Sequence, residues 1–86
     1  MRLQQVRCID IVPDPHSGGY RPHEVEPLAA EIREYGVLRP VLLRPTPRGY
    51  VIVHGERRWR AALMAGLEAI PAYLVQGFGQ DDSVAA

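Results

Sequence analysis

The sequence predicts a small α/β domain with a mixed sheet, in the order strand, helix, strand, strand, helix, strand. Two segments carry apolar residues at helical spacing, and each ends in a glycine followed by an aliphatic residue. Short runs rich in β-branched residues precede, separate and follow these two segments. The chain has 86 residues, which suffice for one domain. We place that domain at residues 1–77 and expect a flexible tail at residues 78–86.

The first strand is expected over QVRCIDIV, residues 5–12, and the turn-rich segment PDPHSGGYRP follows as a loop. A helix is expected from Glu24, because glutamates in the first turn are favoured by the helix dipole. Gly36 should end this helix. Its apolar stripe has the i, i+3, i+4, i+7 spacing, at Val25, Leu28, Ala29 and Ile32.

Residues 40–45 and 49–54 read as two strands of a hairpin, joined across TPRG. The second helix follows Gly55 and closes at Gly66 and Leu67, as the first closes at its own glycine. AIPAYLV, residues 69–75, is the last expected strand. The residues expected to face the core from the second helix are Trp59, Ala62, Leu63 and Gly66.

The composition argues against several classes of function, among them stand-alone DNA binding, cysteine-built zinc sites and membrane insertion. Ten arginines balance ten acidic side chains, whereas a domain that lives on duplex DNA normally carries a strong positive excess. The single cysteine, Cys8, excludes an internal disulfide and a cysteine-built zinc site, and we expect it to be a small core residue. No apolar run approaches the roughly 20 residues of a membrane span, and the N-terminus does not resemble a signal peptide. We therefore expect a cytoplasmic protein with no membrane partner.

The start of the second helix carries an unusual charge pattern. The helix dipole repels arginines at a helix N-terminus, and each such arginine destabilises the helix by about 0.3–1 kcal/mol. A glycine at that point lets backbone N–H groups approach an anion. A guanidinium group can donate two parallel hydrogen bonds to two oxygens of one phosphate. The pattern predicts a phosphate-binding turn with Arg39 as a secondary contact and His54 at its border. Its members are Gly55, Glu56, Arg57, Arg58 and Arg60.

Two other interpretations of these arginines stay open. They could form surface ion pairs with Glu56 and with the glutamates of the first helix, Glu24, Glu26, Glu31 and Glu34. Such pairs contribute only about 0–1 kcal/mol each, which explains tolerance better than clustering. Alternatively, the arginines could neutralise the phosphates of DNA or contact a partner protein, with an affinity for DNA that falls steeply with salt.

Enzymatic activity is not expected, although weak hydrolysis of a triphosphate stays open. Metal-assisted hydrolysis needs several carboxylates around a cation, and Glu56 is the one acid expected at the proposed pocket. The histidines show no metal-ligand spacing. We therefore assign no catalytic residue and no metal ligand, and we do not expect a nuclease.

The string GERRWRAA, residues 55–62, resembles the arginine-rich box of the ParB-type partition proteins, whose N-terminal domain shares its fold with sulfiredoxin. The resemblance extends over residues 20–45 and 49–75. It implies a regulatory module that binds a nucleoside triphosphate, typically CTP, with magnesium, over the turn from Gly55 to Arg58. It also implies that the loop from Gly36 to Pro40 lines the nucleotide pocket.

The chain departs from the family pattern in several places. Arg39 stands where the family usually has glutamine, so base preference can differ, and Arg21-Pro22-His23 stands in place of a Gln-Pro-Arg box. Glu56 occupies the position of the sulfiredoxin cysteine, so we expect no sulfiredoxin activity. The family's later acidic-asparagine box for magnesium, its DNA reader and its dimerisation domain do not follow here. We therefore expect no DNA clamp from this chain alone, while a homodimer stays open.

Overall fold

The computed structural model describes residues 2–37 and 39–75, which form a five-stranded mixed sheet and two α-helices. The elements in chain order are β1 (Leu3–Arg7), a 3-10 turn η1 (Cys8–Asp10), β2 (Ile11–Val12), α1 (Pro22–Tyr35), β3 (Val41–Thr46), β4 (Gly49–His54), α2 (Glu56–Ala65) and β5 (Ala69–Leu74). The strand order is β1-β5-β3-β4-β2, with β2–β4 and β3–β5 parallel and the other two pairs antiparallel. The predicted α/β class is confirmed.

The single strand expected over residues 5–12 is wrong, because η1 divides it into two strands. Cys8 and Ile11 are both buried, and strict strand alternation cannot bury two residues three positions apart. β1 pairs with β5, and β2 pairs with β4 at the opposite edge of the sheet. Since three residues connect the two edges, the sheet must curve strongly. Cys8 is 2% exposed, which confirms its predicted role in the core.

Helix α1 begins at Pro22, two residues before the expected start, because proline is well suited to the first helical position. The Arg21 N–H donates to Glu24 Oε1 at 2.8 Å. At the other end Gly36 has φ +78° and donates its N–H to the Ile32 carbonyl at 2.7 Å, so the predicted glycine stop is confirmed. Leu28, expected in the buried stripe, is only partly buried.

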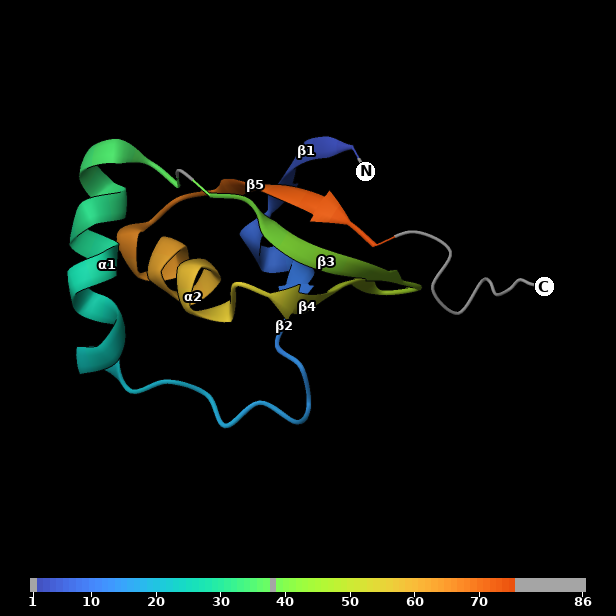
Figure 1. Ribbon diagram of the computed structural model, residues 1–86, viewed down its shortest axis with the longest axis horizontal. Helices are drawn as coiled ribbons and strands as arrows, with labels where there is room; N and C mark the ends of the chain where they lie inside the picture. Colours follow the sequence, from blue (N-terminus) through green and yellow to red (C-terminus); the bar gives the residue numbers. More distant parts are fainter. Residues whose placement is uncertain (1, 38, 76–86) are drawn as a thin grey trace.

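Helix α2 lies between the sheet and α1, as Figure 1 shows. It therefore needs two apolar stripes: Trp59 and Ala62 pack in the main core under the sheet, and Ala61 packs against α1. The expected inward position of Leu63 is wrong, since its side chain is on the remaining side of the helix and is 42% exposed. Gly66 closes the helix as predicted, in the left-handed conformation, but its expected position facing the core is wrong, because it is exposed.

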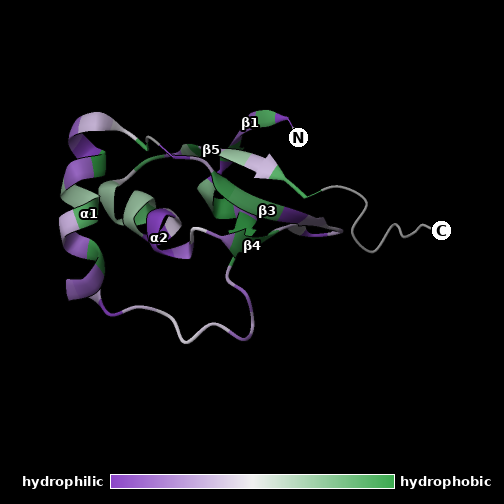
Figure 2. Ribbon diagram, in the orientation of Figure 1, coloured by the Kyte–Doolittle hydropathy of each residue, from purple (hydrophilic) through white to green (hydrophobic). Residues whose placement is uncertain are grey.

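The core has two parts. One lies between the sheet and α2, where Trp59 Nε1 donates to the Cys8 carbonyl at 3.2 Å and so keeps its polar edge paired. The other lies between the helices, and Figure 2 shows the apolar side of α1 turned toward α2. Within the described residues no helix has both the length and the apolarity to cross a membrane. The tail expected at residues 78–86 lies outside them.

Candidate functional site

The turn between β4 and α2 depends on the absence of a side chain at Gly55. Its backbone has φ +99°, in the left-handed region that glycine adopts without strain. A Cβ built there would lie 2.9 Å from Val41 Cγ1 and 3.2 Å from Arg58 Nη1. Glycine therefore lets the N-terminus of α2 pack directly on the start of β3.

Arg58 connects α2 to the loop that leads into β3. Its Nη1 donates to the Pro40 carbonyl at 2.7 Å and to the Arg39 carbonyl at 3.2 Å. Burial, together with the positive charge of Arg39, lowers the pKa of Arg58 from its ordinary value. An arginine still stays protonated in proteins, so the side chain is a fixed cation held in one place by carbonyl oxygens.

Arg57 connects the same end of α2 to the first turn of α1. Its Nε donates to the Glu24 carbonyl at 2.9 Å, while the side chain remains exposed. Within residues 2–37 and 39–75, none of Arg39, Arg57 and Arg58 forms an ion pair with a carboxylate. Three positive charges thus gather around one turn, and in the described part of the chain none of them is within ion-pair distance of a carboxylate.

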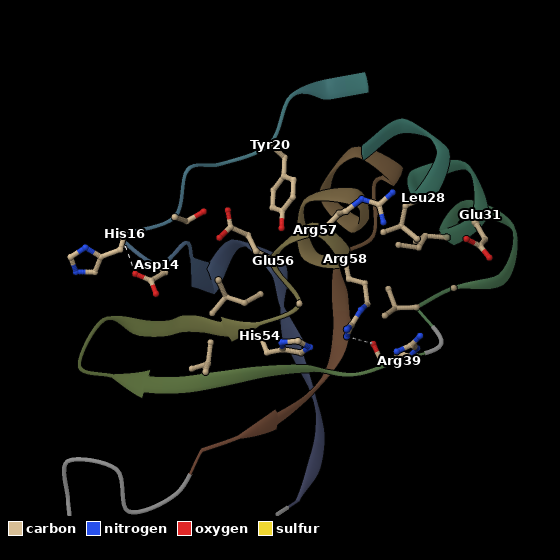
Figure 3. A pocket seen from close by; sticks show the side chains of 17 residues that line it. Asp14, His16, Tyr20, Leu28, Glu31, Arg39, His54, Glu56, Arg57 and Arg58 are labelled. Carbon is tan, nitrogen blue, oxygen red and sulfur yellow. Dashed lines mark hydrogen bonds between the residues drawn. The ribbon is translucent and has the colours of Figure 1, made fainter. Parts of the chain in front are cut away.

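These arginines border an open pocket of about 680 Å³, within the range of small-molecule sites. Figure 3 shows Arg57 and Arg58 in the middle of the pocket, Arg39 below them, and the part of the β2–α1 loop with Asp14 and His16 at the left. Seven of the eight predicted site residues line the pocket. They are Gly36, Arg39, His54, Gly55, Glu56, Arg57 and Arg58.

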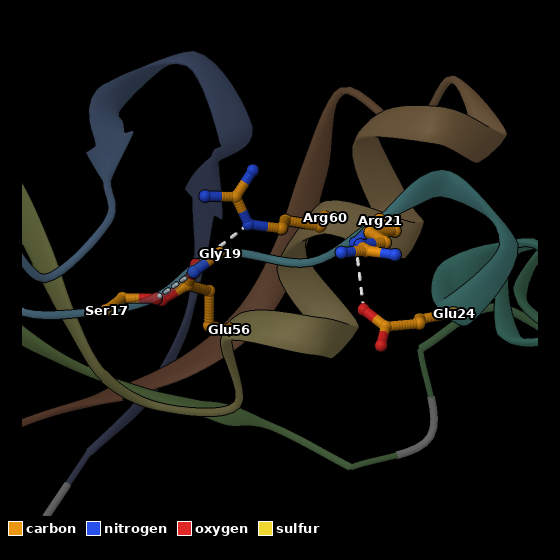
Figure 4. A network of polar contacts seen from close by, with 6 residues as sticks. All are labelled: Ser17, Gly19, Arg21, Glu24, Glu56 and Arg60. Atoms are coloured by element: carbon orange, nitrogen blue, oxygen red, sulfur yellow. Dashed lines mark hydrogen bonds and ion pairs between the residues drawn. The ribbon is translucent and has the colours of Figure 1, made fainter.

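Arg60 is the predicted site residue that does not line the pocket. Its Nε donates to Glu56 Oε2 at 2.8 Å, and its Cζ lies 5.5 Å from the centroid of the Trp59 ring. Figure 4 shows this pair next to the loop at Gly19, where an added Cβ would lie 4.0 Å from Arg60 Nη2. A phosphate contact by Arg60 would require the pair to open, so that role stays a prediction. The pair is also the one place among the described residues where the expected bridging of these arginines by glutamate occurs.

Sequence reasoning missed the contribution of the β2–α1 loop and of α1 to the pocket. The missed polar residues are Asp14, His16, Ser17, Tyr20 and Glu31. The expectation that Glu56 is the one acid at the site is therefore wrong, because the loop and the helix bring two more carboxylates to it from a distance in sequence. The available signal was the length of the loop, since long irregular loops commonly carry function.

The described residues do not form a metal site of their own. In that part of the chain no three His, Cys, Asp or Glu side chains lie close enough to share a metal ion, and Glu56 is already paired with Arg60. Cys8 offers no nucleophile to the pocket either, because it is buried and burial raises the pKa of its thiol.

Comparison with known proteins gives this arrangement a context. The family model of the ParB N-terminal domain matches residues 2–86. A chromosome-partitioning protein ParB of Caulobacter vibrioides is 50% identical over 62 residues, which are 69% of this chain and 20% of that protein. A plasmid-partitioning protein of Xylella fastidiosa is 56% identical over 50 residues, 58% of this chain and 12% of that protein. The chain thus spans a fifth or less of the length of these relatives.

Solved structures of ParB and of sulfiredoxin are similar to this chain as well. C-terminally truncated ParB from Caulobacter crescentus in complex with CTP-gamma-S has a TM-score of 0.79 and 38% identity, over 87% of this chain and 44% of that chain. The same protein in complex with the centromeric parS site has a TM-score of 0.75 and covers 41% of that chain. Sulfiredoxin from Arabidopsis thaliana, at 20% identity, has a TM-score of 0.76 over 93% of this chain and 91% of its own, which shows the shared fold. This chain, with its sulfiredoxin-like fold and its arginine-bordered turn, therefore belongs to the ParB N-terminal domain family.

Proposed function

We propose that this domain binds a nucleoside triphosphate, with CTP as the first candidate and ATP as the second, and acts as a regulatory module of DNA partition. The phosphates lie over the turn from Gly55 to Arg58. The observation that carries the proposal is the gathering of Arg39, Arg57 and Arg58 around one hollow without an ion pair among the described residues. A related ParB, 38% identical, was crystallised with CTP-gamma-S, which supports a triphosphate as the anion.

The geometry suits a polyanion in two ways. The first backbone N–H groups of α2 have no partners inside the helix and face outward at its N-terminus, where anions are favoured. Arg57 and Arg58 are held by carbonyl oxygens of other elements, so little side-chain freedom is lost when a ligand binds. Arg39 is exposed and adds its charge next to Arg58.

We propose that the domain binds the nucleotide and takes no part in a chemical step. Because the described residues supply no metal site, we expect magnesium to accompany the triphosphate rather than to be held by this domain, and we assign no step of hydrolysis to it. Because nucleoside triphosphates and DNA are found in the cytoplasm, we propose a cytoplasmic location for the domain. A homodimer would contain two such pockets.

A second candidate is the phosphate backbone of DNA, and one observation favours it. The same relative was also crystallised with its parS site, although this chain covers 41% of that structure. DNA binding through the pocket arginines would weaken steeply as salt increases, because bound counterions are released.

Isothermal titration calorimetry with CTP, ATP, GTP, UTP and a short duplex, each with and without magnesium, separates the two candidates. We expect CTP to bind the wild type and to bind the Arg57→Ala/Arg58→Ala variant at least about tenfold more weakly, since charged hydrogen bonds contribute about 1.5–3 kcal/mol each. The matched control is Arg33→Ala/Arg48→Ala, which removes the same charge from exposed positions that do not line this pocket.

A thermal-shift series gives an independent readout. A ligand at a hundredfold excess over Kd stabilises the folded state by about 2.7 kcal/mol. A stabilisation by duplex DNA that disappears with salt, and none by any nucleotide, would reverse the order of the two candidates.

A further inference from the structure

Three carboxylates line the pocket, and two of them already have partners. Asp14 Oδ1 accepts the His16 N–H at 2.8 Å within its own loop. Glu56 Oε2 accepts a hydrogen bond from Arg60 Nε at 2.8 Å. The side chain of Glu31, on α1, forms no hydrogen bond or ion pair with any other residue that the structure describes. It therefore offers an unused acceptor to whatever occupies the pocket.

Glu31 stands on the apolar side of the pocket. Leu28 and Ile32 of α1 and Val37 beyond it line that side. Figure 3 shows Leu28 and Glu31 on the side of Arg39, with Asp14 and His16 at the opposite end and Arg57 and Arg58 between. If the phosphates lie on the α2 turn, the aliphatic wall of α1 is the surface best suited to the flat base of a nucleotide.

A carboxylate beside a pocket for a polyanion repels the phosphates, unless it faces a part of the ligand that donates hydrogen bonds. An ionised carboxylate can only accept. On a nucleobase the matching donor is the exocyclic amino group, and carboxylates pair with the amino group of cytosine elsewhere. Uracil has a carbonyl oxygen at the same position, which would face the carboxylate as a second acceptor.

We propose that Glu31 selects the base by accepting a hydrogen bond from its exocyclic amino group, so that CTP is bound in preference to UTP. This inference rests on the proposed function, because it needs the triphosphate to lie on the Gly55–Arg58 turn. It assigns base selection to a side chain of α1, and it makes α1 a specificity element as well as a wall of the pocket.

The test compares CTP and UTP binding to the wild type, to Glu31→Gln and to Glu34→Gln by calorimetry. A glutamine amide can turn to present either its oxygen or its NH₂ group, so Glu31→Gln should accept both bases. We expect the wild type to favour CTP by about tenfold, as one hydrogen bond to a charged acceptor provides, and Glu31→Gln to bring the ratio close to one. Glu34→Gln removes the same charge from an exposed α1 position that does not line the pocket, and should leave the ratio unchanged.

Each outcome has one meaning. Triphosphate binding with the same CTP-to-UTP ratio in the wild type and in Glu31→Gln overturns the role of Glu31 and leaves the proposed function standing. An equal loss of affinity for CTP and UTP in Glu31→Gln overturns it too, because a general contribution to nucleotide binding would then replace base selection. The absence of triphosphate binding by the wild type overturns the proposed function itself. Thermal melting of all three proteins confirms that each is folded.

Discussion

Arg58 donates from Nη1 to the Pro40 carbonyl oxygen at 2.7 Å, which fastens the N-terminus of α2 to the entry of β3. One side chain therefore serves both the fold and the charge of the pocket. Arg39, whose own carbonyl accepts a longer bond from the same nitrogen, contributes an exposed guanidinium to the pocket. The two arginines can be separated by experiment because their structural roles differ.

Arg58→Ala should lower the free energy of unfolding by about 1–2 kcal/mol, since it removes hydrogen bonds from a charged donor to carbonyl oxygens. Arg39→Ala should leave this free energy unchanged within about 0.5 kcal/mol, because its charge opposes that of Arg58 and its side chain is exposed. Both variants should bind CTP more weakly. Urea denaturation followed by Trp59 fluorescence measures stability, and calorimetry measures binding. Equal destabilisation by the two substitutions would contradict this division of roles.

Gly55→Ala should destabilise the protein more than Gly66→Ala does. Both glycines have positive φ, so an alanine at either position strains the backbone by about 1–2 kcal/mol. At Gly55 the new Cβ would also lie 2.9 Å from Val41 Cγ1, whereas at Gly66 nothing lies within 4 Å. Overpacking of this kind adds about 1–3 kcal/mol. Denaturant unfolding of the pair gives the difference, and equal losses would mean that β3 yields to the added methyl group.

The stability of the fold should fall in alkaline solution through Cys8. Burial raises the pKa of this thiol above its ordinary value of 9.0, so the unfolded chain releases the proton at a pH at which the folded chain still keeps it. The unfolded state then binds fewer protons, and the free energy of unfolding decreases as pH rises, by up to about 1.4 kcal/mol per pH unit. The stabilisation is complete below the pKa of the unfolded thiol. Cys8→Ala should lack this decline, and parallel pH profiles of the two proteins would refute it.

Leu63→Ala and Leu43→Ala test the orientation of α2. Leu43, on β3, is fully buried in the main core, so its truncation should cost about 2–5 kcal/mol, while truncation of the 42% exposed Leu63 should cost less than about 1 kcal/mol. Chemical denaturation measures both. A large loss for Leu63→Ala would show that this side of α2 is covered by another part of the molecule.

Local patterns predicted much of the fold. Helices α1 and α2 have clear apolar periodicity and glycine stops, and the β3–β4 hairpin has a short turn between two aliphatic runs. The division of the first strand by η1 escaped prediction because it depends on tertiary structure: β1 and β2 find partners on opposite edges of the sheet. Leu63 was misplaced for a similar reason, since a helix covered on two sides buries small alanines where a one-sided helix would bury a leucine.

The residues of the site also fall into a group that local sequence could predict and a group that depends on tertiary structure. Gly55, Arg57 and Arg58 are adjacent in sequence, so a rule about helix N-termini could find them. Tyr20 and Glu31 reach the pocket only because the β2–α1 loop and α1 fold back across it, and no spacing along the chain records that contact. The pairing of Arg60 with Glu56 has the i, i+4 spacing of neighbours on a helix surface, so it belongs to the part that local sequence could indicate.

The position of α1 as an outer layer has a consequence for motion. It packs chiefly on α2, and its buried side chains belong to the smaller core cluster, whereas the sheet and α2 share the larger one. Amide hydrogens of α1 should therefore exchange with solvent through partial openings that leave β3 and β5 protected. A ligand that touches both helices would suppress those openings, so that occupancy of the pocket could be read from the exchange rates of a helix on the outside of the domain.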